Sequence, residues 1–293
     1  MKIIDCFLYF DEDMLLDIRL NILNKYVSYF VICEATFNHK GESKKLNFDI
    51  KKFSKFKDKI IYLPLENVPQ NLYELKSGDS LEEKNSKILD NALIRENYQR
   101  NFLSNGLKEI SDEDLILVGD LDEIPDLKNF EYKKKITIFK QKMFFYKFNL
   151  IYPEFLWTGS KISKKKHLIS PQWLRNIKTK KYPLWRIDAL FSLKKYHNIE
   201  IIKDGGWHFT NIKSPENIDY KMRNFLHHLE YENSGMKIAD IKKSISEKKI
   251  IYDYFADKKT DKINNSGELQ KINLEGLPDY IVNNKDKFKE WID

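Results

Sequence analysis

The sequence predicts an α/β fold in which a mostly parallel central sheet is flanked by helices. Residues 115–118 are four consecutive apolar residues bounded by charge and glycine, a pattern typical of a strand buried on both faces of a parallel sheet. Residues 3–34 pass from an apolar run through a helical pattern to a second apolar run, which is the order of a βαβ unit.

The remaining elements follow from further apolar runs and helix-start signals. Asp11 with Asp13, and later Ser214 with Pro215, are side chains that begin helices. A long connection is expected over residues 65–84. The expected strands cover residues 3–10, 27–34, 59–64, 115–118, 135–139, 143–150 and 193–202. The expected helices cover residues 14–22 and 86–107, a segment that begins at 214, and further segments after 237.

The most informative stretch is the end of the strand predicted at 115–118. Ligands of parallel sheets bind at the carboxyl ends of the strands, and Asp120 and Asp122 lie there. Their spacing lets both reach one ion, and carboxylate oxygens suit Mg²⁺ or Mn²⁺, which in turn holds phosphate oxygens. A solvated acidic loop is the alternative interpretation.

Two arginines fall among the core-facing positions of the helix predicted over 86–107. A buried guanidinium group needs a carboxylate or phosphate partner. Either Arg100 forms a structural ion pair with Glu96, or Arg95 or Arg100 orients the acidic strand end or a nucleotide phosphate. Glu34 lies at the end of the second predicted strand, where side chains contact ligands. Its position is equally compatible with an exposed acid in a loop.

In a third stretch, residues 204–210, two glycines precede Trp-His-Phe. Because glycine has no Cβ, the backbone at these positions can approach a neighbouring group closely. His208 is either a hydrogen-bonded core histidine or a ligand that completes a metal site begun by the carboxylates. Trp157, Trp173 and Trp185 crowd the preceding region. Such aromatic side chains either belong to the core or form a platform on which a sugar ring stacks.

A formal net charge of +7 is compatible with binding to nucleic acid or to an anionic membrane surface. Only six of the 51 basic residues are arginine, and the lysines are scattered among acids, so we expect no nucleic-acid partner. Cys6 and Cys33 lie in apolar runs, which indicates buried thiols in a reducing compartment. No apolar stretch approaches the roughly 18 residues of a membrane span, and the N-terminus lacks a signal-peptide pattern. We expect a cytoplasmic protein, peripheral to a membrane at most.

Three separated stretches together resemble glycosyltransferase family 17, whose best-known members add the bisecting N-acetylglucosamine to N-glycans. The two strongest matches are Asp120-Leu121-Asp122-Glu123-Ile124-Pro125 and Gly206-Trp207-His208-Phe209, which are specific in combination. The likeness covers about residues 3–232. Its other parts are residues 14–20, 30–37, 41–48, 95–96 and 100–101.

The resemblance implies a GT-A-like nucleotide-sugar-binding fold and inversion at the anomeric carbon. It also implies that the D-x-D motif binds a divalent metal, either Mn²⁺ or Mg²⁺. Asp120 and Asp122 would contact the metal and the sugar nucleotide, with His208 as a further metal or diphosphate contact. The catalytic domain would span residues 1–232, with residues 233–293 as a C-terminal helical extension packed on it. UDP-N-acetylglucosamine is the leading donor, and the acceptor is a glycan hydroxyl group.

The expected reaction is a single displacement in which an acceptor hydroxyl group attacks the anomeric carbon while a nucleoside diphosphate leaves. Inversion needs one general base. The candidates are Glu123, Glu154, Asp188 and Asp204, and we prefer Glu123 or Asp204 because they lie within the two specific motifs. The residues expected to bind the nucleotide sugar are Glu34, Arg95, Arg100, Asp120 and Asp122.

Two other functions are compatible with clustered acids. A metal-dependent phosphohydrolase also uses carboxylates, although its two-metal sites usually need further Asp or His ligands. A non-catalytic nucleotide-sugar-binding module would bind the donor tightly without turning it over.

Overall fold

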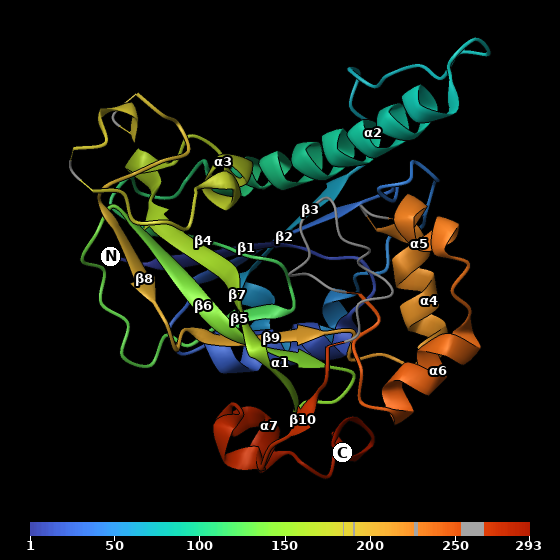
Figure 1. Cartoon of the computed structure of the whole chain (residues 1–293). Coiled ribbons are helices and arrows are strands. Elements are labelled where there is room, and N and C mark those ends of the chain that lie inside the picture. Colours follow the sequence, from blue (N-terminus) through green and yellow to red (C-terminus); the bar gives the residue numbers. More distant parts are fainter. Residues whose placement is uncertain (184, 190, 226–227, 253–266) are drawn as a thin grey trace.

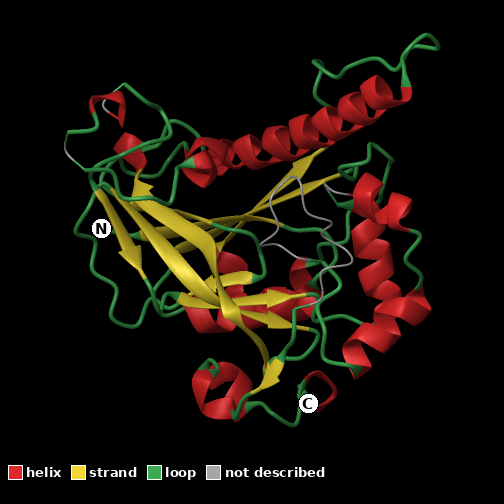
Figure 2. Cartoon of the chain, in the orientation of Figure 1, coloured by secondary structure: helices red, strands yellow, loops and turns green. Residues whose placement is uncertain are grey.

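The computed structural model describes residues 1–183, 185–189, 191–225, 228–252 and 267–293. It is a mixed α/β structure in which helices flank one large sheet (Figure 1, Figure 2). The strands are β1 (Ile3–Leu8), β2 (Tyr29–Ala35), β3 (Ile60–Leu65), β4 (Leu115–Val118), β5 (Glu123–Pro125), β6 (Ile136–Phe145), β7 (Leu150–Lys164), β8 (Ile199–Ile202), β9 (Gly206–Thr210) and β10 (Gln270–Lys271). The α-helices are α1 (Asp13–Leu23), α2 (Leu81–Phe102), α3 (Pro171–Asn176), α4 (Pro215–Asn224), α5 (His228–Ser234), α6 (Ile238–Ser246) and α7 (Asp279–Asn283).

The strands of the sheet follow the order β3-β2-β1-β4-β7-β6-β9-β5, with β10 beside β7 and β8 beside β6. β3, β2, β1 and β4 are parallel to one another, and all four residues of β4 are buried, as predicted. β7 then runs antiparallel to β4 and to β6. β6 is parallel to β8 and β9, and β5 is antiparallel to β9. The sheet is therefore mixed: the expected parallel pairing holds for β3-β2-β1-β4 and for the pairs of β6 with β8 and β9, and it is broken where β7 returns along β4 instead of crossing over.

The strand predicted over 193–202 is shorter than expected, because β8 covers only Ile199–Ile202. Two other predicted boundaries are wrong for identifiable reasons. Residues 143–150 do not form one strand: β6 continues to Phe145, the chain turns at Tyr146, whose φ is 64°, and β7 begins at Leu150. α2 begins five residues before its predicted start. Ser80 and Glu83 form a capping box there, with the Glu83 carboxylate accepting from Ser80 N at 2.8 Å.

Helices cover both faces of the first half of the sheet. Apolar side chains of α1 join one core cluster together with Ile281 of α7 and Phe288. On the other face, the turn after α2 and the helix α3 contribute Leu103, Leu107 and Trp173 to a second cluster. A third cluster joins α4, α5 and α6 to the ends of β6 and β7, and Figure 1 shows these helices stacked at the right. None of the described helices is both long enough and apolar enough to cross a bilayer.

Candidate active site

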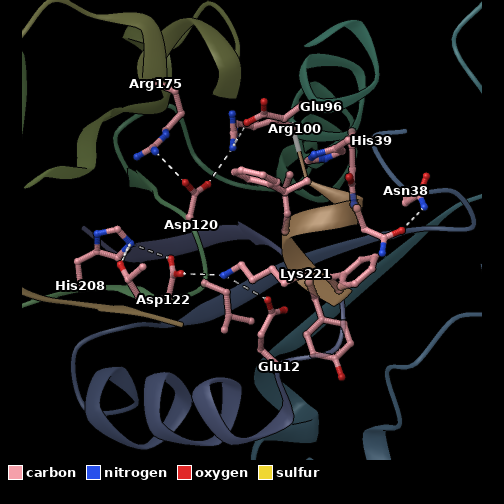
Figure 3. Close-up of a pocket in the computed structure, with 18 of the residues that line it drawn as sticks. Glu12, Asn38, His39, Glu96, Arg100, Asp120, Asp122, Arg175, His208 and Lys221 are labelled. Carbon is pink, nitrogen blue, oxygen red and sulfur yellow. Dashed lines mark hydrogen bonds and ion pairs between the residues drawn. The ribbon is translucent and has the colours of Figure 1, made fainter. Parts of the chain in front are cut away.

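A cavity of about 490 Å³ lies beyond the carboxyl ends of β1, β2 and β4. These strands are neighbours and run parallel, so the segments that follow them meet at one edge of the sheet. The rest of the wall comes from α2, α3, α4, β7 and β9. Figure 3 shows the result, in which helices bring basic side chains up to an acidic strand end.

Asp120 lies between two guanidinium groups (Figure 3). Arg100 donates from Nη2 to Oδ1 at 2.8 Å, and Arg175 donates from Nη2 to Oδ2 at 2.9 Å. Glu96, one turn earlier on α2, pairs with Arg100 at 2.8 Å. Burial alone would raise the pKa of Asp120, but the charges of Arg175 and Arg100 outweigh it and hold the pKa below its usual value. Asp120 is therefore an ionised carboxylate in a fixed orientation.

Asp122 has looser contacts with different elements. Nε2 of His208, on β9, lies 3.4 Å from Oδ1, and Nζ of Lys221, on α4, lies 3.4 Å from Oδ2. Lys221 also lies 3.8 Å from Glu12. Figure 3 marks this ion pair with a dashed line. Burial would raise the pKa of Asp122, but Lys221 and His208 outweigh it and hold the pKa well below its usual value. Both 3.4 Å distances exceed the about 2.7–2.9 Å of tight charge-assisted hydrogen bonds.

The turn that carries the two aspartates is held from beneath by Arg19 of α1. This guanidinium group is fully buried and bonds Asp5 of β1 through Nε and Nη2, at 2.8 and 2.7 Å. Its Nη1 donates to the carbonyl oxygens of Asp120, Leu121 and Glu123, at 2.9, 3.2 and 2.6 Å. Arg19 therefore fixes the path of the D-x-D backbone without lining the cavity.

Neither carboxylate that we preferred as the base lines the cavity. Glu123 is fully buried, where Arg175 donates to both of its oxygens at 2.7 and 3.0 Å and Trp157 Nε1 donates at 2.6 Å. In this position Glu123 orients Arg175. Asp204 is exposed and pairs with Lys142 at 2.9 Å.

Two of the residues expected to bind the nucleotide sugar, Glu34 and Arg95, also lie outside the cavity wall. Glu34 is fully buried and accepts from Lys44 at 2.6 Å, from the Tyr62 hydroxyl group at 2.9 Å and from two backbone N–H groups. Arg95 donates to the carbonyl oxygen of His39 at 3.0 Å. The structure thus gathers Arg100, Asp120, Asp122 and His208 at the cavity and leaves the other predicted site residues around it.

Sequence reasoning missed Arg175 and Lys221 as cavity residues. A signal existed for each, because Ser170-Pro171 and Ser214-Pro215 are the cap and first residue of the helices that carry them. The three tryptophans separate: Trp157 lines the cavity, Trp173 is mostly buried in the core, and Trp185 is exposed.

Comparison with known proteins identifies the family of the chain. The model of a protein family described as glycosyltransferase family 17 matches residues 1–292. A comparison with curated proteins found no match. The family match spans nearly the whole chain and extends past the motifs into the C-terminal residues. The chain therefore belongs to glycosyltransferase family 17 and is a glycosyltransferase.

Proposed function

We propose that this glycosyltransferase is metal-dependent and inverting, has a GT-A-type fold, and moves a sugar from a UDP-sugar to a glycan hydroxyl group. N-acetylglucosamine is the first sugar to test. The observation that carries the proposal is the pair Asp120 and Asp122, which face one cavity just beyond a buried parallel strand. At about 490 Å³ the cavity lies within the range of roughly 300–1,000 Å³ typical of ligand sites.

The donor atoms at the motif suit a divalent cation. Oδ1 of Asp122 and Nε2 of His208 are 3.4 Å apart, near the separation of about 3 Å between adjacent ligands on an octahedral ion with bonds of about 2.1 Å. Asp122 and His208 would hold Mn²⁺ or Mg²⁺, which supplies Lewis-acid stabilisation of the leaving diphosphate, and Asp120 would join them through an oxygen lone pair that Arg100 and Arg175 do not use. The described residues contain no ready-made cluster of three such ligands. We therefore propose that phosphate oxygens of the donor complete the coordination, so that metal and donor bind cooperatively.

The net charge of the side chains around Asp120 also supports the proposal that a cation binds here. The carboxylates of Asp120, Glu96 and Glu123 share the guanidinium groups of Arg100 and Arg175. This group of five side chains carries one excess negative charge. A cation bound beside it is favoured at a low-dielectric site.

Lys221 is suited to stabilise the leaving group from the chain's own side. Its ammonium group lines the cavity and lies 3.4 Å from Asp122, so it stands next to the place proposed for the diphosphate. Negative charge grows on that diphosphate as the glycosidic bond breaks, and a prearranged cation lowers the barrier. Replacing Lys221 with methionine should lower kcat by about 10²-fold.

We propose Glu12 as the general base. It lines the cavity beyond β1, and its nearest cations, Lys213 and Lys221, lie at 3.5 and 3.8 Å, too far for tight hydrogen bonds. Burial would raise the pKa of Glu12, but Lys213 and Lys221 outweigh it and lower the pKa, so the carboxylate is ionised at neutral pH. Glu96, which also lines the cavity, is held at 2.8 Å by Arg100.

Isothermal titration tests the donor site. We expect one UDP-sugar to bind wild type in the presence of Mn²⁺ and to lose at least tenfold in affinity when the metal is chelated. Asp122→Asn should lose the metal dependence, whereas Glu131→Gln, an exposed acid far from the cavity, should not. Binding that is equally tight with a chelator would refute metal dependence.

Turnover measurements test the base and separate the rival functions. Glu12→Gln should abolish transfer and leave donor affinity nearly intact, and Glu96→Gln serves as the comparison. If Glu12→Gln transfers sugar at the wild-type rate, Glu12 is not the base. Release of phosphate in excess of transferred sugar would indicate a phosphohydrolase, and tight donor binding without turnover on any glycan acceptor would indicate a binding module.

A further inference from the structure

A cluster of exposed apolar side chains lies outside the candidate active site, in the segment between α3 and β8. Trp185 is 75% exposed, Phe191 86%, Leu193 67% and Ile187 64%. Ile169, just before α3, is 61% exposed. Single exposed apolar side chains are common on soluble proteins, but a segment that concentrates several large ones is a candidate interaction site.

The segment is anchored at its base and leaves these side chains outside. Nε1 of Trp173, on α3, donates to the carbonyl oxygen of Leu193 at 2.7 Å. The backbone N–H of Lys178 donates to Lys194 at 2.7 Å. Arg186 and Lys195 both pair with Asp188 at 2.7 Å. The exposed apolar residues therefore belong to a cross-linked loop that projects beyond α3, at the upper left of Figure 1.

Residues 178–195 are also strongly basic. They contain five lysines and Arg186 against the single acid Asp188. Lys178, Lys180 and Lys181 are exposed and lie in the same segment of the chain as the apolar side chains. We define the patch by its apolar members, Ile169, Trp185, Ile187, Phe191 and Leu193, and by its basic members, Lys178, Lys180, Lys181, Lys194 and Lys195.

A second exposed apolar loop provides an internal contrast. Before α2, at the upper right of Figure 1, Val68, Tyr73, Leu75 and Leu81 are each at least 50% exposed. Residues 66–83 carry five acids and one lysine, the opposite sign of charge. Of these two loops, the one after α3 combines its exposed apolar side chains with positive charge. Leu46 and Ile50, in the lysine-rich residues 44–59, are also exposed, but only to 37% and 40%.

We propose that the patch binds the surface of an anionic lipid bilayer. Tryptophan and phenylalanine side chains insert at the boundary between headgroups and acyl chains, and neighbouring lysines attract anionic headgroups while their stems cover apolar surface. The patch has both parts, and the loop before α2 has only the first. The same α3 that anchors the loop carries Arg175 into the cavity, so the patch and the candidate active site share one supporting helix. This proposal depends on neither the donor nor the metal.

Vesicle co-sedimentation tests the proposal with the full chain. We expect binding to vesicles of phosphatidylcholine with 30% phosphatidylglycerol, weakening as salt rises, and at least tenfold weaker binding to phosphatidylcholine alone. A brominated lipid should quench wild-type tryptophan fluorescence, and Trp185→Phe should remove most of that quenching.

Matched variants locate the surface. Lys180→Gln with Lys181→Gln should weaken binding about 25-fold, at about fivefold per lysine, and Phe191→Ser should weaken it about tenfold. Lys285→Gln with Lys289→Gln makes the same change in net charge on exposed residues next to α7, and Tyr73→Ser removes an aromatic side chain from the acidic loop. Both controls should bind as wild type, and all variants should keep the wild-type circular dichroism spectrum.

Absence of binding to anionic vesicles at low salt would overturn the proposal. Equal losses in the patch and control variants would also overturn it, because net charge alone would then explain the binding. Binding to a polyanion such as heparin with no binding to vesicles would assign the patch to an acidic macromolecule instead of a bilayer.

Discussion

At the scale of single residues, the candidate site is defined by where the chain uses arginine. Only six of the 51 basic residues are arginine, and three of these, Arg19, Arg100 and Arg175, hold carboxylates in or beneath the cavity. Each guanidinium group contacts more than one acceptor, a forked geometry that the lysine ammonium group cannot match. In a chain that otherwise prefers lysine, half of the arginines stand where a carboxylate or a backbone turn of the candidate site must be held in one orientation.

Glu123→Gln distinguishes an orienting residue from a base. Its carboxylate is fully buried against Arg175, so loss of its charge leaves a buried guanidinium group partly unpaired. We expect the free energy of unfolding to fall by about 3 kcal/mol in urea titrations. Asp204→Asn, at an exposed pair, should cost less than about 1 kcal/mol. A variant at either position that keeps full stability but loses all transfer would make that residue the base.

Lys161 gives the protein a pH dependence of stability near neutrality. This lysine of β7 is buried and donates to the carbonyl oxygens of Arg175 and Ile177 at the end of α3. Burial first, and then the charge of Arg175, lower its pKa to about 7, against 10.5 for an unperturbed lysine. Above pH 7 the unfolded chain therefore binds one more proton than the folded chain, and the free energy of unfolding rises with pH.

We expect this rise to approach about 1.4 kcal/mol per pH unit between pH 7 and 9, relative to Lys161→Met, in urea titrations at each pH. Lys128→Met, at an exposed position, serves as the control. Its free energy of unfolding should change with pH in parallel with that of the wild type. Parallel curves for wild type and Lys161→Met would show that Lys161 keeps its proton throughout.

At the scale of elements, the site depends on the turn between β4 and β5. α1 supplies Arg19, which joins β1 to three carbonyl oxygens of that turn, and Phe209 N donates to the Asp122 carbonyl oxygen at 2.9 Å. Gly206 begins β9 at a φ of 120°, where a Cβ would lie 2.2 Å from the Ile124 carbonyl oxygen. The two specific motifs therefore meet as β5 and β9, paired antiparallel.

Arg19→Lys tests this support. A lysine keeps the charge opposite Asp5 but cannot also reach the carbonyl oxygens that Arg19 now satisfies. We expect the free energy of unfolding to fall by about 3 kcal/mol, and transfer to slow even below the melting temperature, because buried acceptors lose their donor. Arg223→Lys, in an exposed pair with Asp219, should cost less than about 1 kcal/mol. Equal small losses in both variants would contradict the role of Arg19.

At the scale of the whole molecule, the C-terminal residues share the core of the sheet domain. β10 pairs with β7, and Phe288 packs edge-on against Phe148 with ring centroids 5.6 Å apart. The Tyr280 hydroxyl group donates to Asp17 of α1 at 2.9 Å. A division into residues 1–232 and an extension over 233–293 stays a prediction, and cooperativity of unfolding can test it.

Phe288→Ala should lower the free energy of unfolding by about 3–5 kcal/mol and shift a single transition, because the side chain is 1% exposed within the main core. Calorimetry and urea titration with two probes would measure it. The exposed neighbour Lys285→Ala should change stability by less than about 0.5 kcal/mol. Two separate transitions would make the C-terminal residues an independent unit.

Features that depend on local pattern could be predicted from the amino-acid sequence. The buried β4 with its acidic end, the βαβ start and the helix begun by Ser214-Pro215 all follow from apolar runs and capping side chains. Two separated motifs were sufficient to indicate the family, which the match over residues 1–292 confirms.

Contacts between side chains distant in the sequence depend on how the whole sheet is arranged. Local patterns carry no information on the antiparallel return of β7, which places Trp157 and α3 beside β4. They therefore could not show that Arg175 reaches Asp120, 55 residues away along the chain, or that Glu123 is sealed beneath it. A carboxylate in a motif becomes a ligand, a base or a buried partner according to which distant segment packs against it, and packing depends on the whole sheet.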